Sequence, residues 1–350
     1  MAMTSTRPIR LGILGLGRAG FGMQRQELTG REHLFEIVAG CDTKKDKRDR
    51  FAADVGCRVH ARLDDLLADG DVEMVSVATR SHDHYDHARQ CLHAGKHVFL
   101  EKPMTRTYDE ARRLVRYARR CKAQLHVRHN RRYEPAFTHV REIIDSGKLG
   151  EVFEVKLRRN GYRRRDDWQT LRRFGGGQGL NWGPHIVDHA LQLLDAPVKD
   201  LWSDLQLVAS AGNTEDHFRV VLTGRNGRVV DVEISTAAAV GEPVYLVLGD
   251  RGGLWCDEKD IHLKYLDPRK KLPPRRAEPG DPGNSFGTAD DLKWIEKTVP
   301  VKPAETIDMT MIWDDLYASV RKGKAMRVGL DAALAVMKTI SQAKAGTKFA

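Results

Sequence analysis

The sequence has few cysteines, and none is placed to bind a metal. The count is odd, and no pair has the spacing of a metal site or a redox motif: Cys41, Cys57, Cys91, Cys121 and Cys256. This usage fits reduced thiols. We therefore expect a cytoplasmic protein without a bound metal.

Long apolar runs are also missing. The longest are a few residues, far short of the ~20 that a helix needs to cross a bilayer. The first ten residues, MAMTSTRPIR, show no apolar core or cleavage site of a signal peptide. With 350 residues, 41% apolar and 30% charged, the chain has the composition of a globular protein of two domains that does not associate with membranes.

Positive charge is in excess, with a formal net charge of +10. Part of it is clustered in one segment: Arg158, Arg159, Arg163, Arg164, Arg165, Arg172 and Arg173. No zinc finger, RNA-binding signature or recognition helix accompanies the cluster, so we expect no nucleic-acid partner. We expect the segment to lie near a substrate mouth, where the guanidinium groups would favour substrates that carry a carboxylate, which they bind through two hydrogen bonds.

The first part of the chain alternates strand-like and helix-like segments, which is typical of a parallel sheet with crossover helices. The expected strands are 9–14, 35–41, 72–78, 97–100 and 124–127. The expected helices run from the glycines near residue 15 to about 28, over 81–94 and over 108–121. We assign residues 1–128 to a dinucleotide-binding domain.

The pattern changes after Gly150, where apolar and polar residues alternate in segments joined by Gly, Asn and Asp turns. This indicates an antiparallel sheet, with strands at 152–157, 201–207, 217–222, 228–234, 244–248 and 261–265. Helices are expected at 135–146, 183–194, 305–322 and 330–344, and a long loop at 267–290. We assign residues 129–350 to a substrate-binding and oligomerisation domain, whose C-terminal helix packs back on the first domain.

A glycine motif links the first strand to the next helix, at Gly15, Leu16, Gly17, Arg18, Ala19 and Gly20. In this G-x-G-x-x-G pattern the glycines allow a tight turn, approach of a pyrophosphate to the backbone, and close helix–strand packing. Asp42 lies 22 residues after Gly20, at the end of the next strand, where it can bind the ribose hydroxyls. We predict bound NAD; NADP stays open because Lys44 and Lys45 could neutralise a 2′-phosphate.

Further motifs follow in an order shared with a known family. They are AGKHVFLEKP at 94–103, ATRSHDH at 78–84, RRYEP at 131–135, and GGG at 175–177 followed by NWGPHIVD at 181–188. With the glycine motif, they resemble the Gfo/Idh/MocA oxidoreductases, the family of glucose-fructose oxidoreductase and inositol dehydrogenase.

The resemblance implies an N-terminal Rossmann domain with a doubly wound sheet, then a C-terminal domain with an open-faced, mostly antiparallel β-sheet. It implies NAD(P)-dependent oxidation of a hydroxyl on a sugar, polyol or sugar derivative, and a homo-dimer or homo-tetramer formed through the open sheet. Beyond the glycine motif and Asp42, it places cofactor contacts at Thr79, Arg80, His84, Glu101 and Lys102. The sequence departs from the family pattern at Arg80 and Ser81, where Pro and Asn are usual, and at Asn181, where Asp is common.

Oxidation of an alcohol needs a base for the hydroxyl proton, and His185 suits that role. Pro184 places it in the first turn of a helix, where the dipole keeps the imidazole neutral. Asp188 is three residues on and would orient the ring. Lys102, at a strand's carboxyl end, would stabilise alkoxide charge. Asn181 cannot shuttle a proton and is limited to hydrogen bonding. The remaining candidate substrate contacts are Asn130, Arg131, Tyr162 and Trp168.

Two other functions remain open. Some relatives of this family use NAD for transient oxidation during glycosidic bond cleavage, without net redox change. Others are non-catalytic, cofactor-sensing regulators, for which loss of the lysine and histidine would be expected. Both Lys102 and His185 are present, which favours an enzyme.

Overall fold

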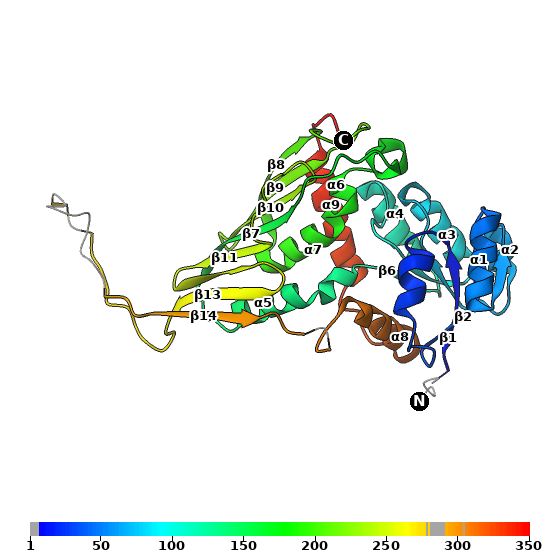
Figure 1. Ribbon diagram of the computed structural model, residues 1–350, viewed down its shortest axis with the longest axis horizontal. Coiled ribbons are helices and arrows are strands. Elements are labelled where there is room, and N and C mark those ends of the chain that lie inside the picture. The colour runs from blue at the N-terminus through cyan, green and yellow to red at the C-terminus, as the bar shows by residue number, and fades with distance from the viewer. Residues whose placement is uncertain (1–6, 278, 281–290, 304) are drawn as a thin grey trace.

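The computed structural model describes residues 7–277, 279–280, 291–303 and 305–350. Two β-sheets lie side by side, and each carries its own helices (Figure 1). One sheet is built from the first part of the chain and the other from the second, as predicted.

The first sheet has six parallel strands in the order β3-β2-β1-β4-β5-β6. These are β1 Ile9–Leu14, β2 Phe35–Cys41, β3 Arg58–His60, β4 Met74–Val77, β5 His97–Leu100 and β6 Leu125–Val127. The chain runs outward from β1 in one direction and then returns to β4 on its other side. This doubly wound arrangement confirms the predicted Rossmann sheet and puts the carboxyl ends of β1 and β4 next to each other.

Two of the four α-helices of this part, α3 and α4, match their predictions, and two were missed. The helices are α1 Lys45–Val55, α2 Leu63–Ala68, α3 His84–His93 and α4 Tyr108–Ala118. The predicted α-helix after the glycines is a π-helical turn over Gly20–Arg25, and 81–83 is a 3₁₀ turn before α3. The sequence pattern did not predict α1, α2 or the strand β3. Helix α1 is polar and buries only Phe51, and β3 and α2 are short, with three and six residues.

The second sheet has eight strands in the order β14-β13-β12-β11-β7-β10-β9-β8. These are β7 Val152–Asn160, β8 Val198–Gln206, β9 His217–Gly224, β10 Val229–Ser235, β11 Tyr245–Gly249, β12 Gly252–Cys256, β13 Asp260–Leu266 and β14 Trp294–Pro300. All neighbours are antiparallel except β7 and β10. Strands β12 and β14 were missed, because β12 starts with two glycines and β14 carries mostly exposed residues.

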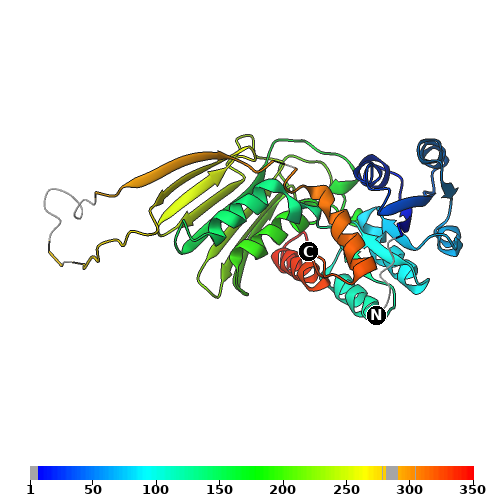
Figure 2. The ribbon, with the colours of Figure 1, turned by 90° about the horizontal axis from the view of Figure 1, so that it is seen from below.

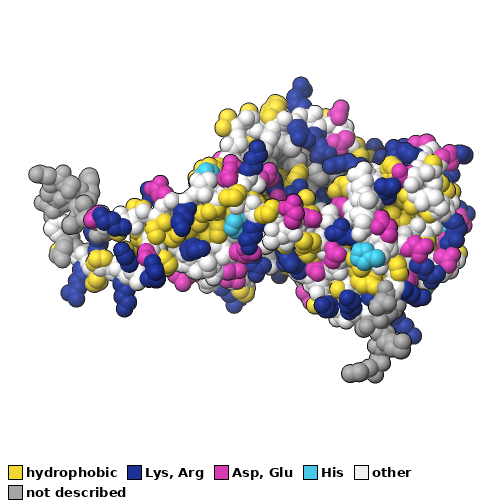
Figure 3. All heavy atoms as spheres, turned by 60° about the horizontal axis from the view of Figure 1, so that its bottom comes forward, with side chains coloured by type: hydrophobic (Ala, Val, Ile, Leu, Met, Phe, Trp, Pro, Cys, Tyr) yellow, Lys and Arg dark blue, Asp and Glu magenta, His cyan; other side chains and the backbone are white. Residues whose placement is uncertain are grey.

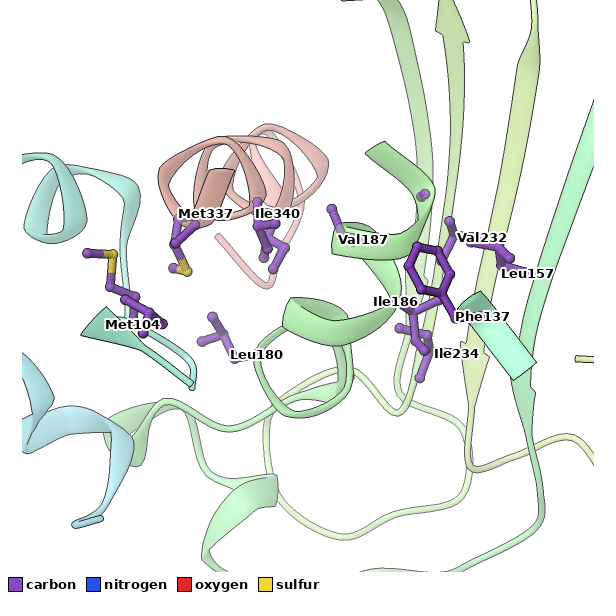
Figure 4. Packing of buried hydrophobic residues seen from close by; sticks show 14 of the residues in the cluster. Met104, Phe137, Leu157, Leu180, Ile186, Val187, Val232, Ile234, Met337 and Ile340 are labelled. Carbon is purple, nitrogen blue, oxygen red and sulfur yellow. The ribbon is translucent and has the colours of Figure 1, made fainter. Parts of the chain in front are cut away.

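Helices cover one face of this second sheet and leave the other open (Figure 2). They are α5 Pro135–Asp145, α7 Gly183–Leu194 and α9 Leu330–Lys344, with the single turn α6 Gln178–Asn181 before α7. Figure 4 shows Ile186 of α7 beside Phe137 and Ile234, and Val187 turned toward Ile340 of α9. Helix α7 is thus buried between the sheet and α9, and its first turn is held rigidly.

Helix α8, Ile312–Lys322, packs instead against the first sheet. The ring of Trp313 meets Phe35 of β2 and Phe99 of β5 edge-on, at centroid distances of 5.3 and 4.8 Å. Helix α8 begins at Ile312 rather than near 305 as predicted, after a 3₁₀ turn at Met309–Met311. A helix late in the sequence therefore completes the core of the first sheet.

Residues 278 and 281–290 of the predicted loop at 267–290 lie outside the described residues; within 267–277 the chain has no helix or strand. Among the described helices, none combines the length and apolar character needed to span a membrane.

Candidate active site

A cleft of about 1480 Å³ lies where the two sheets meet, and residues of both line it. In Figure 3 Lys and Arg side chains flank the hollow between the two lobes. Its floor is formed by the segments that follow β1, β4 and β5. In open α/β sheets these carboxyl ends form the ligand-binding edge.

The glycine turn occupies one end of the cleft. Gly15 has a positive φ of 94°, and a Cβ there would lie 2.7 Å from the carbonyl oxygen of Ala78. A Cβ at Gly20 would lie 2.1 Å from the carbonyl oxygen of Gly15, so the third glycine allows the close packing that was predicted. Gly15, Gly17, Arg18 and Ala19 line the cleft, whereas Leu16 and Gly20 do not. The backbone of this turn fits a cofactor's phosphates.

Asp42 lies beside this turn and lines the same cleft. Its carboxylate accepts hydrogen bonds from the backbone N–H groups of Leu16 at 2.9 Å and Lys44 at 3.0 Å. The Lys47 ammonium lies 3.5 Å from it. The acid therefore ties the end of β2 to the glycine turn, and cations lie close by. The carboxylate fits a ribose hydroxyl, and the cations fit a 2′-phosphate on that ribose.

The predicted contacts after β4 also reach the cleft. Thr79, Arg80 and His84 line it. The buried His84 ring lies 2.6 Å from the Pro103 carbonyl oxygen and 3.2 Å from that of Thr79. Burial lowers the pKa of His84. His84 thus links the loop after β4 to the loop after β5, and both loops face the cleft.

Glu101 and Lys102 lie at the end of β5. Glu101 is buried and accepts hydrogen bonds from Gln24 at 3.1 Å and Arg128 at 2.9 Å. Burial raises the pKa of Glu101, but the charges of Arg128 and Lys102 outweigh it and keep the group ionised. The Lys102 ammonium donates to the Asn181 backbone carbonyl at 2.8 Å, and burial lowers its pKa to about 8.

His185 enters the cleft from the first turn of α7, as predicted. Its Nδ1 is buried without a hydrogen-bond partner, so Nε2 is the nitrogen left to face the cleft. Its pKa is held well below the usual range, first by burial and then by the charges of Lys102 and Arg131. The direction matches the prediction, although burial replaces the helix dipole as the leading cause. The ring is neutral at neutral pH and can accept a proton.

The orienting role expected for Asp188 needs correction. Both Asp188 oxygens accept from the Arg132 guanidinium, at 2.5 and 2.6 Å, and none binds His185. A buried carboxylate pairs with a guanidinium in two-point geometry when one is available. Asp188 therefore fixes α7 to the 3₁₀ turn at Asn130–Tyr133 and positions His185 only through the helix.

Asn181 serves the site through two different groups. Its backbone carbonyl holds Lys102, and its side-chain oxygen accepts from Gln169 at 3.1 Å. The hydrogen-bonding role expected for the amide is therefore directed at Gln169, away from Lys102. The residue anchors the lysine in a way that does not depend on its side chain.

Of the expected substrate contacts, Asn130, Arg131 and Trp168 line the cleft, but Tyr162 does not. Tyr162 is 57% exposed and pairs with Ala237 in a β-bridge. Alternation along an extended segment turns successive side chains to opposite sides, so Arg163 faces the cleft instead.

The arginines of the cluster at 158–173 likewise lie partly at the cleft and partly away from it. Arg159, Arg163 and Arg165 line the cleft. Arg158 is buried against Asp231 at 2.8 Å. Arg172 binds the backbone carbonyls of Lys348 and Ala350. Only part of the segment therefore lies at the cleft, and its expected place at a substrate mouth stays a prediction.

Several lining residues were not predicted, among them Lys47, His87, Arg128 and Gln169. Arg128 follows directly after β6, so the strand-end rule that pointed to Lys102 would have found it too. Gln169 lies in the 3₁₀ turn Trp168–Thr170, a segment with no comparable sequence pattern. Within the described residues, no group of His, Cys, Asp or Glu is arranged to hold a metal.

Fold and cleft together define an NAD-binding oxidoreductase, and comparison with known proteins agrees. Residues 9–129 match the family model described as oxidoreductase family, NAD-binding Rossmann fold, and 137–255 match the GFO/IDH/MocA C-terminal domain. The chain belongs to the GFO/IDH/MocA family. It is an enzyme of the NAD(P)-dependent dehydrogenase kind.

Three similar proteins span nearly the whole chain. An uncharacterised oxidoreductase of Schizosaccharomyces pombe is 31% identical, covering 88% of this chain and 86% of its own. The Bacillus subtilis scyllo-inositol 2-dehydrogenase (NADP(+)) is 27% identical, covering 97% and 94%. The structure of the Bacillus subtilis oxidoreductase YvaA superposes with a TM-score of 0.83 at 21% identity, covering 99% and 98%; it shows the shared fold.

Proposed function

We propose that this enzyme transfers a hydride between NAD(P) and a CH–OH carbon of a sugar, polyol or sugar derivative. The observation that carries the proposal is that one cleft holds a neutral histidine and a buried lysine beside the glycine turn. Two relatives named as inositol dehydrogenases support the substrate class.

In this proposal His185 Nε2 takes the proton of the substrate hydroxyl, while the Lys102 ammonium donates a hydrogen bond to the same oxygen. The lowered pKa of His185 leaves the ring unprotonated at neutral pH, which is the form that a general base needs. Lys102 stabilises the negative charge that develops on oxygen. Bound NAD(P) supplies the acceptor for the hydride that leaves carbon.

The test is a panel of sugars, inositols and their acids with NAD and with NADP, followed by absorbance and by mass spectrometry of products. Formation of reduced cofactor with a ketone or lactone product is the expected result. Release of product from a glycoside with no absorbance change would instead favour transient oxidation. Binding without any turnover would favour a regulator.

We further propose that Asp42 binds the adenosine ribose. Asp42→Ala should weaken NAD binding by about tenfold or more, since hydrogen bonds to a charged acceptor are worth about 1.5–3 kcal/mol. Calorimetry on the wild type and the variant measures this. Because Asp42 also accepts the Leu16 N–H, Asp42→Asn is the control that keeps an acceptor oxygen. Equal NAD affinity in wild type and Asp42→Ala would remove the ribose role.

We also propose that the open face of the second sheet forms the contact of a homo-oligomer. Strand β9 alternates buried and partly exposed residues, and Trp202 and Trp255, paired with Val221 and Leu246, are 55% and 38% exposed. Exposed apolar side chains on one sheet face mark an interaction surface.

Light scattering at micromolar concentration should therefore give at least twice the 39.5 kDa chain mass. Trp202→Glu should lower the measured mass, because it would bury a charge in the contact. Val208→Glu, at an exposed position beyond the end of β8, is the matched control. A wild-type mass near 39.5 kDa would contradict the proposal.

A further inference from the structure

Positive charge exceeds negative charge around the cleft. Eleven Lys or Arg and five Asp or Glu line it. Four of the cations lie near the glycine turn and Asp42, where the phosphates of the cofactor are expected: Arg18, Lys44, Lys47 and Arg62. The others lie around the segments that carry Lys102 and His185, so a surplus remains at the substrate end.

Most of these remaining cations already have partners. Arg131 pairs with Glu134 at 3.0 Å, Arg159 pairs with Glu134 at 2.5 Å, and Arg165 pairs with Asp167 at 2.7 Å. Arg128 lies between Glu27 and Glu101. These arginines are held in place by acids.

Arg163 and Arg80 differ, because neither side chain has an ion pair or hydrogen bond within the described residues. The backbone N–H of Arg163 donates to the Thr236 carbonyl at 2.8 Å, so the residue sits on a fixed segment. The Arg80 guanidinium lies over the rings of Trp168 and Phe174, at 5.7 and 4.9 Å. Two guanidinium groups that line the cleft, one following β4 and one following β7, therefore remain available for an anion.

We infer that the substrate is an anionic sugar or polyol, whose carboxylate or phosphate group is bound by Arg163 together with Arg80. Guanidinium groups recognise both oxyanions through paired N–H donors. The inference rests on the proposed function, since it takes the cleft beside Lys102 and His185 to be the substrate site. It narrows the substrate class from neutral polyols to their acids and phosphates.

The test measures binding to the NADH-loaded enzyme by calorimetry, with D-glucuronate, D-glucose 6-phosphate and neutral D-glucose as probes. At least one anion should bind about tenfold or more tightly than glucose. Arg163→Gln should weaken binding of that anion by about tenfold and leave glucose unchanged. Arg80→Gln should weaken binding of the anion by a similar factor, measured after NADH binding to this variant has been shown to be intact. Arg164→Gln is the matched control, because Arg164 is exposed like Arg163 but does not line the cleft.

Whichever of the two anions binds more tightly shows whether the site prefers a carboxylate or a phosphate group. If neither anion binds more tightly than glucose, including the case where none binds, the inference is wrong. An equal effect of Arg163→Gln and Arg164→Gln would also overturn it. The enzyme could also bind the anion in a way that depends on Arg163 and yet show no redox activity in the substrate panel. That result would contradict the proposed reaction and leave this inference standing.

Discussion

His185→Ala should lower kcat by about 10²–10⁴, the usual contribution of a general base. The imidazole is buried, neutral and turned with Nε2 to the cleft, and within the described cleft lining His84 and His87 are held by Pro103 and Thr79. The third histidine of that lining, His82, has its Nε2 3.3 Å from the Asp83 carboxylate. Stopped-flow absorbance of NADH under saturating substrate measures the loss.

Asn181→Ala provides the comparison. It removes the hydrogen bond from Gln169 but keeps the backbone carbonyl that holds Lys102, so kcat should fall about tenfold or less. Circular dichroism and NADH binding show whether each variant retains its fold. If Asn181→Ala is as inactive as His185→Ala, the amide organises the transition state and His185 is not the sole base.

Lys102 should produce the basic limb of the pH profile of kcat/KM. Burial lowers its pKa to about 8, so the ammonium that donates to the substrate oxygen is lost as the pH rises through about 8. Oxidation should therefore slow above that pH. On the acid side, the lowered pKa of His185 keeps its base form until well below pH 6.5, so the profile should be flat between these limits.

Lys102→Ala should lower kcat/KM by about 10²–10⁴. Lys102→Arg keeps a positive charge at this position, and arginine stays protonated at high pH. The activity that this variant retains should therefore show no loss near pH 8. A limb near pH 8 that persists in Lys102→Arg would show that another group titrates there.

The sequence predicted the parts of this site that depend on local pattern. The glycine turn follows a buried strand, and Lys102 and Asp42 end strands of a parallel sheet, so their shared edge follows from topology alone. His185 was placed by Pro184 at the helix start. Each inference needed only neighbours in the chain and one rule about sheets.

The failures have a common physical origin. Helical spacing put Asp188 on the face of His185, but it could not show that Arg132, 56 residues away, would take both carboxylate oxygens. Tyr162 was predicted to face the cleft, but its neighbour Arg163 does so instead. Helix α1 was missed because its polar sequence leaves one buried residue. Long-range competition for partners is not encoded in local spacing.

Helix α8 has a consequence for how the chain is made. Ile312, Trp313 and Leu316 are fully buried beside Ile9, Phe35 and Phe99, and the Trp313 indole donates to Glu27 at 2.8 Å, the same carboxylate that holds Arg128. During synthesis, domains generally fold in order from the N-terminus. The nucleotide-binding lobe here cannot complete its folding in this order, because the apolar sheet face that carries Ile9, Phe35 and Phe99 stays uncovered until residues 312–317 have left the ribosome. A fragment that ends before α8 should therefore aggregate, and the two lobes should unfold as one cooperative unit.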